Sequence, residues 1–295
     1  MMAPPVLRLE RSRRKLDFVH DYKHRRAAEA DYPELVCQPF DLYDADSGDL
    51  VAVYRHVADD PLTGSWLDAL AALLPTVPYH VTFRTRGVKT TSRVFGYLPR
   101  ITIRRDFCTS TTLATEAPEQ HNAVAAAAEY ASRVYAQHQP DLYARHQAQA
   151  ERILPDYLLP GGVFTSGIIN ENNPLRYHFD RGNITHTWSA MLAFKWATTG
   201  GHLSLPEWQI GVEIRDRSLF LFDGQRTIHG VTPILRLRPD SRRYTIVYYA
   251  MASMWNCLEP QAELARVRGV RTAREIRNDR THPGLEEWRT DEGRR

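Results

Sequence analysis

The chain has 295 residues, of which 43% are hydrophobic and 25% charged, and its net charge is +3. This is the composition of an ordinary globular protein, long enough to bury a substantial core. No apolar run approaches the ~20 residues of a membrane span, and the basic N-terminus lacks the apolar centre of a secretory signal, so we expect a cytoplasmic protein that is not secreted.

The first 160 residues are predicted to contain short strands followed by supporting helices. Runs rich in β-branched and aromatic residues predict strands at 50–54, 79–83, 93–97 and 101–104, with one helix among them at 66–74. Apolar residues at helical spacing predict a helix at 119–139, which Pro140 ends, and a second at 141–153. We expect these helices to pack on the outside of a sheet.

Residues 161–255 are again rich in strand patterns, without intervening helices. The predicted strands are 162–170, 176–180, 189–195, 202–204, 210–214, 218–222, 227–231 and 243–250. So many short strands in sequence favour an antiparallel barrel or jelly roll over a doubly wound parallel sheet. The Arg-rich extension 256–295 is expected to form a surface helix with a loose end. We treat 1–295 as a single domain of α+β class, mainly β.

Three cysteines lie far apart in the sequence and form no CxxC pair. They are Cys37, Cys108 and Cys257. This spacing disfavours a disulfide framework or a structural zinc site, and we expect three reduced thiols.

A histidine and an aspartate stand two residues apart in 175-LRYHFDRGN-183. Residues two apart on a strand point to the same face, so His178 and Asp180 can converge on one metal ion. With 12 histidines in the chain, an HxD pair can also arise by chance and be only a polar strand end.

A third ligand is offered by His229, on a short β-rich run 49 residues after Asp180. Two imidazoles and one carboxylate that leave three coordination positions open are the ligand set of non-haem iron(II) oxygenases. The competing interpretation is that His229 is a core histidine with a hydrogen-bond partner.

Arg243 and Thr245 share one face of the last predicted strand. If that face points into a barrel, the buried guanidinium needs a carboxylate partner. The C5 carboxylate of 2-oxoglutarate, held by an arginine and a hydroxyl, would supply it. A surface arginine on an edge strand is the alternative.

His178, Asp180, His229 and Arg243, in this order and spacing, resemble the Fe(II)/2-oxoglutarate dioxygenase superfamily and, within it, the TET/J-binding-protein branch. The resemblance covers about 163–252 and is carried by 164-FTSGIINENNPLRYHFDRGN-183, 200-GGHLSLPEW-208, 229-HGVTPI-234 and 243-RYTIVYY-249. It implies a double-stranded β-helix (jelly-roll) core, with iron held by His178, Asp180 and His229.

The same resemblance implies roles for further residues. Arg243 and Thr245 would bind the cosubstrate 2-oxoglutarate, and Asn183 would contact the base, because members of this branch oxidise the 5-methyl group of pyrimidines in nucleic acid. The cysteine-rich zinc-binding region of the animal enzymes is missing. A base-contacting histidine is replaced near Met251, so 5-methylcytosine and thymine both remain open as the target. The small size suits a microbial or bacteriophage source.

Basic residues cluster in three segments despite the small net charge. Residues 84–105 contain seven Lys or Arg and no acid, residues 1–26 contain eight against three acids, and residues 266–280 contain six Arg against two acids. Such clusters either neutralise phosphates or form an ordinary solvated surface. The substrate-backbone candidates are Arg84, Arg86, Lys89 and Arg93.

The sequence therefore predicts an Fe(II)- and 2-oxoglutarate-dependent dioxygenase that hydroxylates the 5-methyl group of a pyrimidine in DNA. It would convert 5-methylcytosine to 5-hydroxymethylcytosine and onward to further oxidised forms. The substrate base would be flipped out of the duplex or single-stranded. We expect no membrane and no obligate protein partner. The alternatives are a hydroxylase of a small molecule or free nucleoside, and a catalytically silent nucleic-acid-binding barrel.

Overall fold

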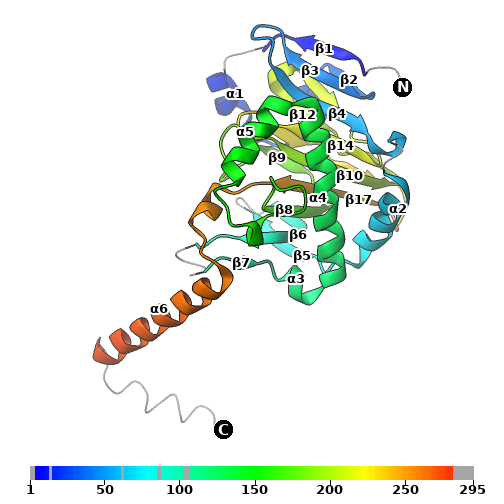
Figure 1. Ribbon diagram of the computed structural model, residues 1–295. Helices are drawn as coiled ribbons and strands as arrows, with labels where there is room; N and C mark the ends of the chain where they lie inside the picture. Colours follow the sequence, from blue (N-terminus) through cyan, green and yellow to red (C-terminus); the bar gives the residue numbers. More distant parts are fainter. Residues whose placement is uncertain (1–3, 13–14, 61–62, 85–87, 102–106, 282–295) are drawn as a thin grey trace.

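The computed structural model describes residues 4–12, 15–60, 63–84, 88–101 and 107–281. It shows a strand-rich α+β architecture with a large sheet, a smaller sheet and helices against the large one (Figure 1). No helix in these ranges is long and apolar enough to cross a membrane.

The large sheet joins strands from both halves of the chain. In the described residues it has ten strands, with β7 paired to β6 beside the path β1-β3-β4-β14-β10-β17-β8-β6-β5. β1 runs parallel to β3, and the other pairs are antiparallel. The strands are β1 Val6–Leu9, β3 Phe40–Asp44, β4 Leu50–His56, β5 His80–Arg84, β6 Val88–Leu98, β7 Thr109–Ser110, β8 Ser166–Glu171, β10 Ser189–Trp196, β14 Ser218–Phe222 and β17 Arg242–Tyr249.

The smaller sheet carries strands that alternate in sequence with those of the large sheet. Its order is β2-β13-β12-β15-β9, and a separate two-stranded ladder joins β11 to β16. The strands are β2 Glu34–Val36, β9 Leu175–His178, β12 Leu203–Leu205, β13 Ile210–Val212, β15 His229–Val231, β11 Thr198–Gly200 and β16 Ile234–Arg236. The chain therefore crosses repeatedly from one sheet to the other between β8 and β17.

Alternation along the strands divides the interior into two cores. On β14, Phe220 and Phe222 pack with residues of the smaller sheet, whereas Leu219 and Leu221 pack under the helices. This is the period-2 pattern of a sheet buried on both faces.

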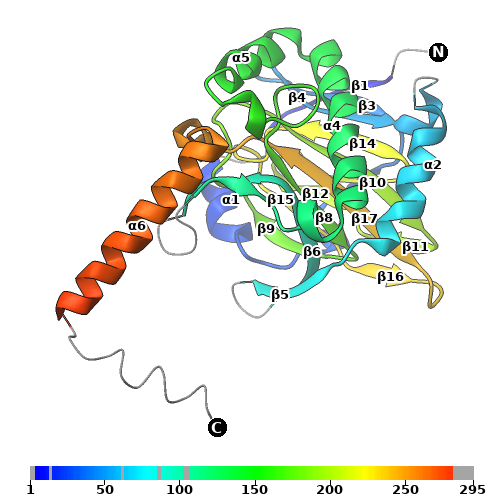
Figure 2. The same cartoon turned by 60° about the horizontal axis from the view of Figure 1, so that its bottom comes forward.

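The helices line the outer face of the large sheet, most clearly α2 and α4 (Figure 2). α4 begins at Pro118, where the fixed φ of proline suits the first turn, and Tyr248 of β17 donates a hydrogen bond to its Val124 carbonyl. The helices are α1 Lys15–Tyr22, α2 Gly64–Leu73, α3 Leu113–Glu116, α4 Pro118–His138, α5 Pro140–Ala150 and α6 Pro260–Thr281.

The expectation of three reduced thiols is wrong. Cys108, just before β7, and Cys257, just before α6, form a disulfide across 149 residues of sequence, while Cys37 is free. Both partners lie in a small apolar cluster with Tyr157 and Met254. The pairing depends on tertiary packing that sequence spacing does not report.

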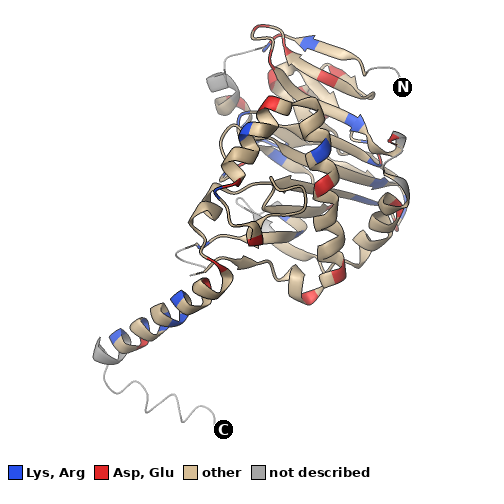
Figure 3. Ribbon diagram, in the orientation of Figure 1, with Lys and Arg blue, Asp and Glu red and all other residues tan. Residues whose placement is uncertain are grey.

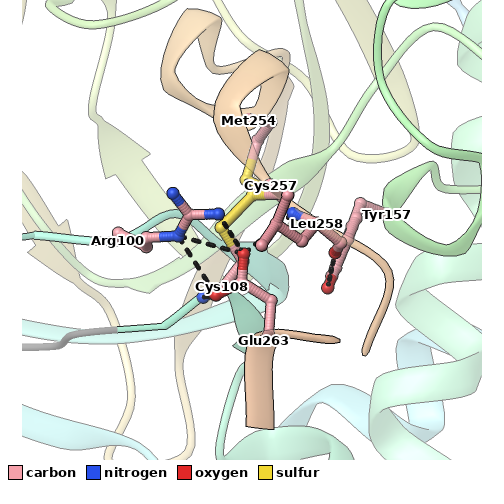
Figure 4. Close-up of polar contacts among 7 residues, drawn as sticks. All are labelled: Arg100, Cys108, Tyr157, Met254, Cys257, Leu258 and Glu263. Atoms are coloured by element: carbon pink, nitrogen blue, oxygen red, sulfur yellow. Dashed lines mark hydrogen bonds and ion pairs between the residues drawn. A yellow bond between two sulfur atoms is a disulfide. The ribbon is translucent and has the colours of Figure 1, made fainter. Parts of the chain in front are cut away.

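Beside this disulfide, Glu263 of α6 is buried as a multiple hydrogen-bond acceptor (Figure 4). Its carboxylate accepts hydrogen bonds from the Arg100 guanidinium and from the backbone N–H groups of Cys108 (3.1 Å) and Leu258 (2.8 Å). Burial alone would raise the pKa of Glu263, but these hydrogen bonds outweigh it and hold the pKa below its ordinary value. The first turn of α6 is thereby fixed to the body of the protein.

Because its folded pKa is lowered, Glu263 contributes stability that is present above its unfolded pKa of about 4.3 and lost as the pH falls through the folded value. We expect Glu263→Gln to lower the free energy of unfolding by about 1–3 kcal/mol near neutral pH. Urea unfolding between pH 7 and pH 3 measures this. The difference from the wild type should shrink below pH 4, and a difference that grows on acidification would contradict the assignment.

Candidate active site

His178, Asp180 and His229 converge although 49 residues separate the second from the third. β9 and β15 are antiparallel neighbours, and His178 is the direct partner of His229 in their register. Asp180 follows two residues after His178. His178 Nε2 lies 3.7 Å and His229 Nε2 3.9 Å from Asp180 Oδ1, and the two imidazole centroids are 4.3 Å apart. In the described part of the chain, this is the one group of three or more such side chains with spacing suited to a metal ion.

Backbone carbonyls fix the ring orientation and the tautomer of both imidazoles. His178 Nδ1 lies 2.8 Å from the Arg176 carbonyl, and His229 Nδ1 lies 3.0 Å from the Thr227 carbonyl. A carbonyl only accepts, so each Nδ1 carries the proton and donates it. The Nε2 lone pairs are then left to face Asp180. This is the arrangement in which metal-binding histidines are held and oriented.

The site is buried on one side and open on the other. The side chain of His229 is 8% exposed and packs edge-on against Phe222, whereas His178 and Asp180 are each 27% exposed. A metal ion held here would therefore keep access for further ligands.

Gly224 makes room for the Asp180 carboxylate. Its carbonyl accepts a hydrogen bond from the Asp180 backbone N–H, and a Cβ at position 224 would lie 2.2 Å from Asp180 Oδ2. Asp223-Gly224 reads from the sequence as a turn and nothing more. The closeness of this turn to the metal ligands was not predictable, because the turn and Asp180 belong to distant segments.

Gly224→Ala is expected to push the Asp180 carboxylate out of position and weaken metal binding by about 10- to 100-fold, the range found for residues that support metal ligands. Titration of the metal-free protein with Fe(II) under anaerobic conditions measures this. Gly269→Ala is the matched control, since its added methyl group meets no atom within 4 Å. Equal affinities for all three proteins would contradict the role of Gly224.

Arg243 is fully buried and lacks a carboxylate partner among the described residues. It lies on β17 on the same face as Val247, which packs into the core between the sheets, and its Nε and Nη2 have no hydrogen-bond acceptor. Burial lowers its pKa to about 10, because an apolar environment disfavours the charged form. A buried cation without a partner is unfavourable and indicates a binding site for an anion.

Gly201 brings the chain close to this guanidinium. It has a φ of +66°, and a Cβ at this position would lie 2.9 Å from Arg243 Nε. Two residues later β12 begins, and β12 pairs with β15, the strand that carries His229. The chain therefore passes from the Arg243 side chain at Gly201 into β12, the direct neighbour of the strand that carries His229. Thr245, two residues after Arg243, is buried as well.

Asn183 lies just beyond the metal-ligand loop and is half-buried. It forms a β-bridge with Met251, its Nδ2 donates to Ser189 Oγ at 3.2 Å, and its carbonyl accepts from Gln225 Nε2 at 2.6 Å. Gln225 directly follows Gly224, so Asn183 is tied to the turn that supports Asp180.

The four basic residues predicted to contact phosphates differ in their exposure and in whether the structure describes them. Lys89 is exposed on β6. Arg84 ends β5, Arg86 lies outside the described residues, and nothing is described of the Arg84 side chain.

The prediction for Arg93 is wrong. Its side chain is 1% exposed, forms an ion pair with Glu116 and donates to Thr112 Oγ1 at 2.9 Å. Helix α3, which carries Glu116, covers this position of β6, so Arg93 is not available to a phosphate.

The chain was compared with known proteins. Residues 99–252, just over half of the chain, match the Tet/JBP family, described as the oxygenase domain of the 2OGFeDO superfamily. Among solved structures, NgTET1 in complex with 5mC DNA has a TM-score of 0.53 and 16% identity, over 76% of this chain and 80% of that one. This similarity shows a shared fold. None of the curated protein sequences matches the chain.

Two further solved structures are similar at a lower level. An oxidoreductase of the 2OG-Fe(II) oxygenase family from Burkholderia pseudomallei has a TM-score of 0.41 and 13% identity, over 68% of this chain and 85% of that one. OsALKBH1 has a TM-score of 0.40 and 11% identity, over 68% and 96%.

Proposed function

The chain belongs to the Tet/JBP family of Fe(II)- and 2-oxoglutarate-dependent dioxygenases, and on this premise we propose that it hydroxylates the 5-methyl group of a pyrimidine base in DNA, with 5-methylcytosine as the leading target. Membership makes Fe(II) the metal and 2-oxoglutarate the cosubstrate. The jelly-roll description, the residue roles and the substrate are our proposals.

The observation that carries the proposal is the buried, unpartnered guanidinium of Arg243 on β17 of the large sheet, whose inner face packs on the smaller sheet that carries His178 and His229. A dicarboxylate that chelates a metal at one end and pairs with Arg243 at the other would satisfy both groups. The far carboxylate would supply the acceptors that Nε and Nη2 lack, in the planar geometry that arginine favours. Thr245, on the same strand face, would add a hydroxyl donor.

His178, Asp180 and His229 would hold the iron. One carboxylate and two neutral imidazoles leave three coordination positions for cosubstrate and oxygen. With 2-oxoglutarate and oxygen the bound metal supplies the oxidising chemistry, and the protein positions the methyl group and limits access of water. By accepting hydrogen bonds from Nδ1, the Arg176 and Thr227 carbonyls would orient both imidazole Nε2 atoms toward a bound metal.

Two sets of strands support a jelly-roll core. β8, β17, β10 and β14 lie adjacent in the large sheet, and β9, β15, β12 and β13 in the smaller one. The chain alternates between these sets, and their facing side chains share one core. The partial exposure of His178 and Asp180 would leave room for a substrate beside the metal.

DNA as the substrate is supported by the fold shared with NgTET1, whose structure was solved with 5mC DNA. Asn183 is our candidate for contacting the base, because its side chain lies just past Asp180 in the loop bonded to the metal-supporting turn. A 5-methyl group in a duplex would reach the iron only after the base is flipped out of the stack.

The experiment is reconstitution of the metal-free protein with Fe(II) and 2-oxoglutarate without oxygen, followed by nucleic acid in air. Duplex and single-stranded DNA with 5-methylcytosine or thymine, the matching RNA and free nucleosides are digested and analysed by mass spectrometry. We expect 5-hydroxymethylcytosine from methylated DNA. Oxidised thymine instead would change the target base, and oxidation of nucleosides alone would replace the polymer by a small-molecule substrate.

A further inference from the structure

Helix α6 leaves the body of the protein as a basic rod. It projects away from both sheets, and arginines follow one another along it (Figure 3). Between 264 and 277 it carries five arginines and one glutamate, a net charge of +4. These arginines, which we call the α6 arginines, are exposed: Arg266, Arg268, Arg271, Arg274 and Arg277. Neither the metal site nor the cosubstrate site uses them.

The segment before α6 is joined to the loop that follows the metal ligands. Ile184 N–H donates to the Ala250 carbonyl at 2.8 Å, and Ala252 N–H donates to the Gly182 carbonyl at 3.2 Å. Asn183, between them, bridges to Met251. The segment that leads into α6 is therefore bonded to the same loop as the proposed base contact.

The direction of α6 is fixed at its N-terminal end. The disulfide Cys108–Cys257 and the buried Glu263 join the last residues before the helix, and its first turn, to the body (Figure 4). Glu263 is engaged by Arg100, so it does not offset the α6 arginines. A basic helix held in this way carries its charge away from the body in a fixed direction.

We propose that α6 binds the phosphate backbone of the nucleic acid whose reactive base occupies the active site. The inference rests on the proposed function, to which it adds the surface that holds the polymer. Arginines bind phosphate oxygens through charge-assisted and often bidentate hydrogen bonds, and such contacts set register without reading sequence.

The length and composition of α6 favour a polymeric polyanion. Its 22 residues extend about 33 Å at 1.5 Å per residue, close to the ~34 Å of one turn of duplex DNA. At 100° per residue the α6 arginines spread over more than half of the helix circumference. This distribution suits an extended polyanion that contacts the helix from more than one side.

A lipid surface fits α6 less well. A helix that lies on a membrane needs an apolar face opposite its basic one. The exposed large apolar residues of α6 are Leu264 and Ile276, 12 positions apart, and they share no face at helical spacing.

Neutralising part of α6 tests the proposal. We compare the full-length protein, loaded with Fe(II) and 2-oxoglutarate without oxygen, with the variant Arg268→Gln/Arg271→Gln/Arg274→Gln. The matched control is Arg133→Gln/Arg236→Gln/Arg238→Gln, which removes the same charge from exposed positions on α4, on β16 and just after β16. Figure 2 shows β16 on the side of the body away from α6. The readout is the affinity for methylated duplex DNA as a function of salt.

Each lost phosphate contact lowers the salt slope by about 0.9 on duplex DNA, so the α6 variant should lose about 2–3 in slope and at least roughly tenfold in affinity at 0.1 M salt. The control variant should bind like the wild type. Equal losses in both variants would indicate only general charge and would overturn the proposal. So would an unchanged slope in the α6 variant.

Two further arms separate the alternatives. Anionic lipid vesicles and an acidic polypeptide are titrated in parallel with the wild type and the α6 variant. If the variant loses affinity for either of these but binds DNA like the wild type, a nucleic-acid role for α6 is overturned. If the α6 variant loses DNA affinity but the wild type oxidises no base, the proposed function fails and this inference stands. If the wild type oxidises methylated DNA and the α6 variant has the same KM for it, this inference fails alone.

Discussion

Asp180→Ala is expected to reduce turnover of 2-oxoglutarate by more than 100-fold while leaving the fold intact. Asp180 is the one carboxylate of the proposed metal ligands, and its Oδ1 lies within 4 Å of both imidazole Nε2 atoms. Removing it leaves two neutral ligands, and the loss should exceed the 10- to 100-fold found for residues that merely support a ligand. Succinate formation, followed against time with excess Fe(II), measures the effect.

Asp46→Ala is the matched control, since Asp46 is an exposed aspartate in the turn between β3 and β4. Its turnover should equal that of the wild type. The thermal midpoint of Asp180→Ala without metal should stay close to that of the wild type, because the Asp180 side chain is partly exposed. Wild-type turnover in Asp180→Ala would remove this residue from the metal site.

Arg243→Met is expected to raise the free energy of unfolding and to weaken the binding of 2-oxoglutarate. At neutral pH the unpartnered guanidinium costs on the order of 3 kcal/mol, because burial lowers its pKa to about 10, and methionine fills a similar volume without that charge. The KM for 2-oxoglutarate should rise at least about 30-fold, the lower end for loss of a buried charge pair. Urea unfolding without 2-oxoglutarate and steady-state kinetics measure the two effects.

Arg93→Met provides a sharp contrast, because Arg93 is equally buried but has Glu116 as its partner. This change should lower stability and leave the KM for 2-oxoglutarate unaltered. Destabilisation by Arg243→Met of the same size as by Arg93→Met would show that Arg243 has a structural role.

The gain from Arg243→Met also has a defined pH dependence. The folded pKa of Arg243 is lowered to about 10, so the unfolded chain binds more protons only above about pH 10, and the wild type recovers stability only as the pH rises above that value. Below pH 10 both states hold the proton and the penalty is constant. The stability difference between the variant and the wild type should therefore not change from pH 6 to pH 9.

The interior of the protein was predictable where strand alternation alone decides which way a residue points. This rule places Arg243 and Val247 toward the core between the sheets, whereas β9 ends at His178 and Asp180 lies two residues beyond the strand that was predicted to carry both. The helix at 119–139 was predictable because its apolar residues repeat at helical spacing from Val124 to Tyr135. The six strands predicted between 189 and 250 are present with ends shifted by a few residues, but β11 and β16 were not predicted.

The wrong predictions concern residues whose contacts are made by segments distant in the sequence. Arg93 lies in a basic run, yet α3 covers it with Glu116, which the composition of the run cannot report. The Cys108–Cys257 disulfide was missed for the same reason, because its two cysteines come from segments 149 residues apart. β1, β2 and β3 were missed because each is short and is stabilised by pairing with other strands. The predicted strand at 101–104 lies mostly outside the described residues.

The central claim is that this chain couples 2-oxoglutarate turnover at His178, Asp180 and His229 to oxidation of a methylated base in DNA. The most direct test measures succinate and oxidised pyrimidine in the same reaction, for the wild type and for Asp180→Ala. The account predicts one succinate for each oxidation step of the base by the wild type with methylated DNA, and neither product from the variant. Succinate without an oxidised base in any DNA, or base oxidation that survives in Asp180→Ala, would contradict it.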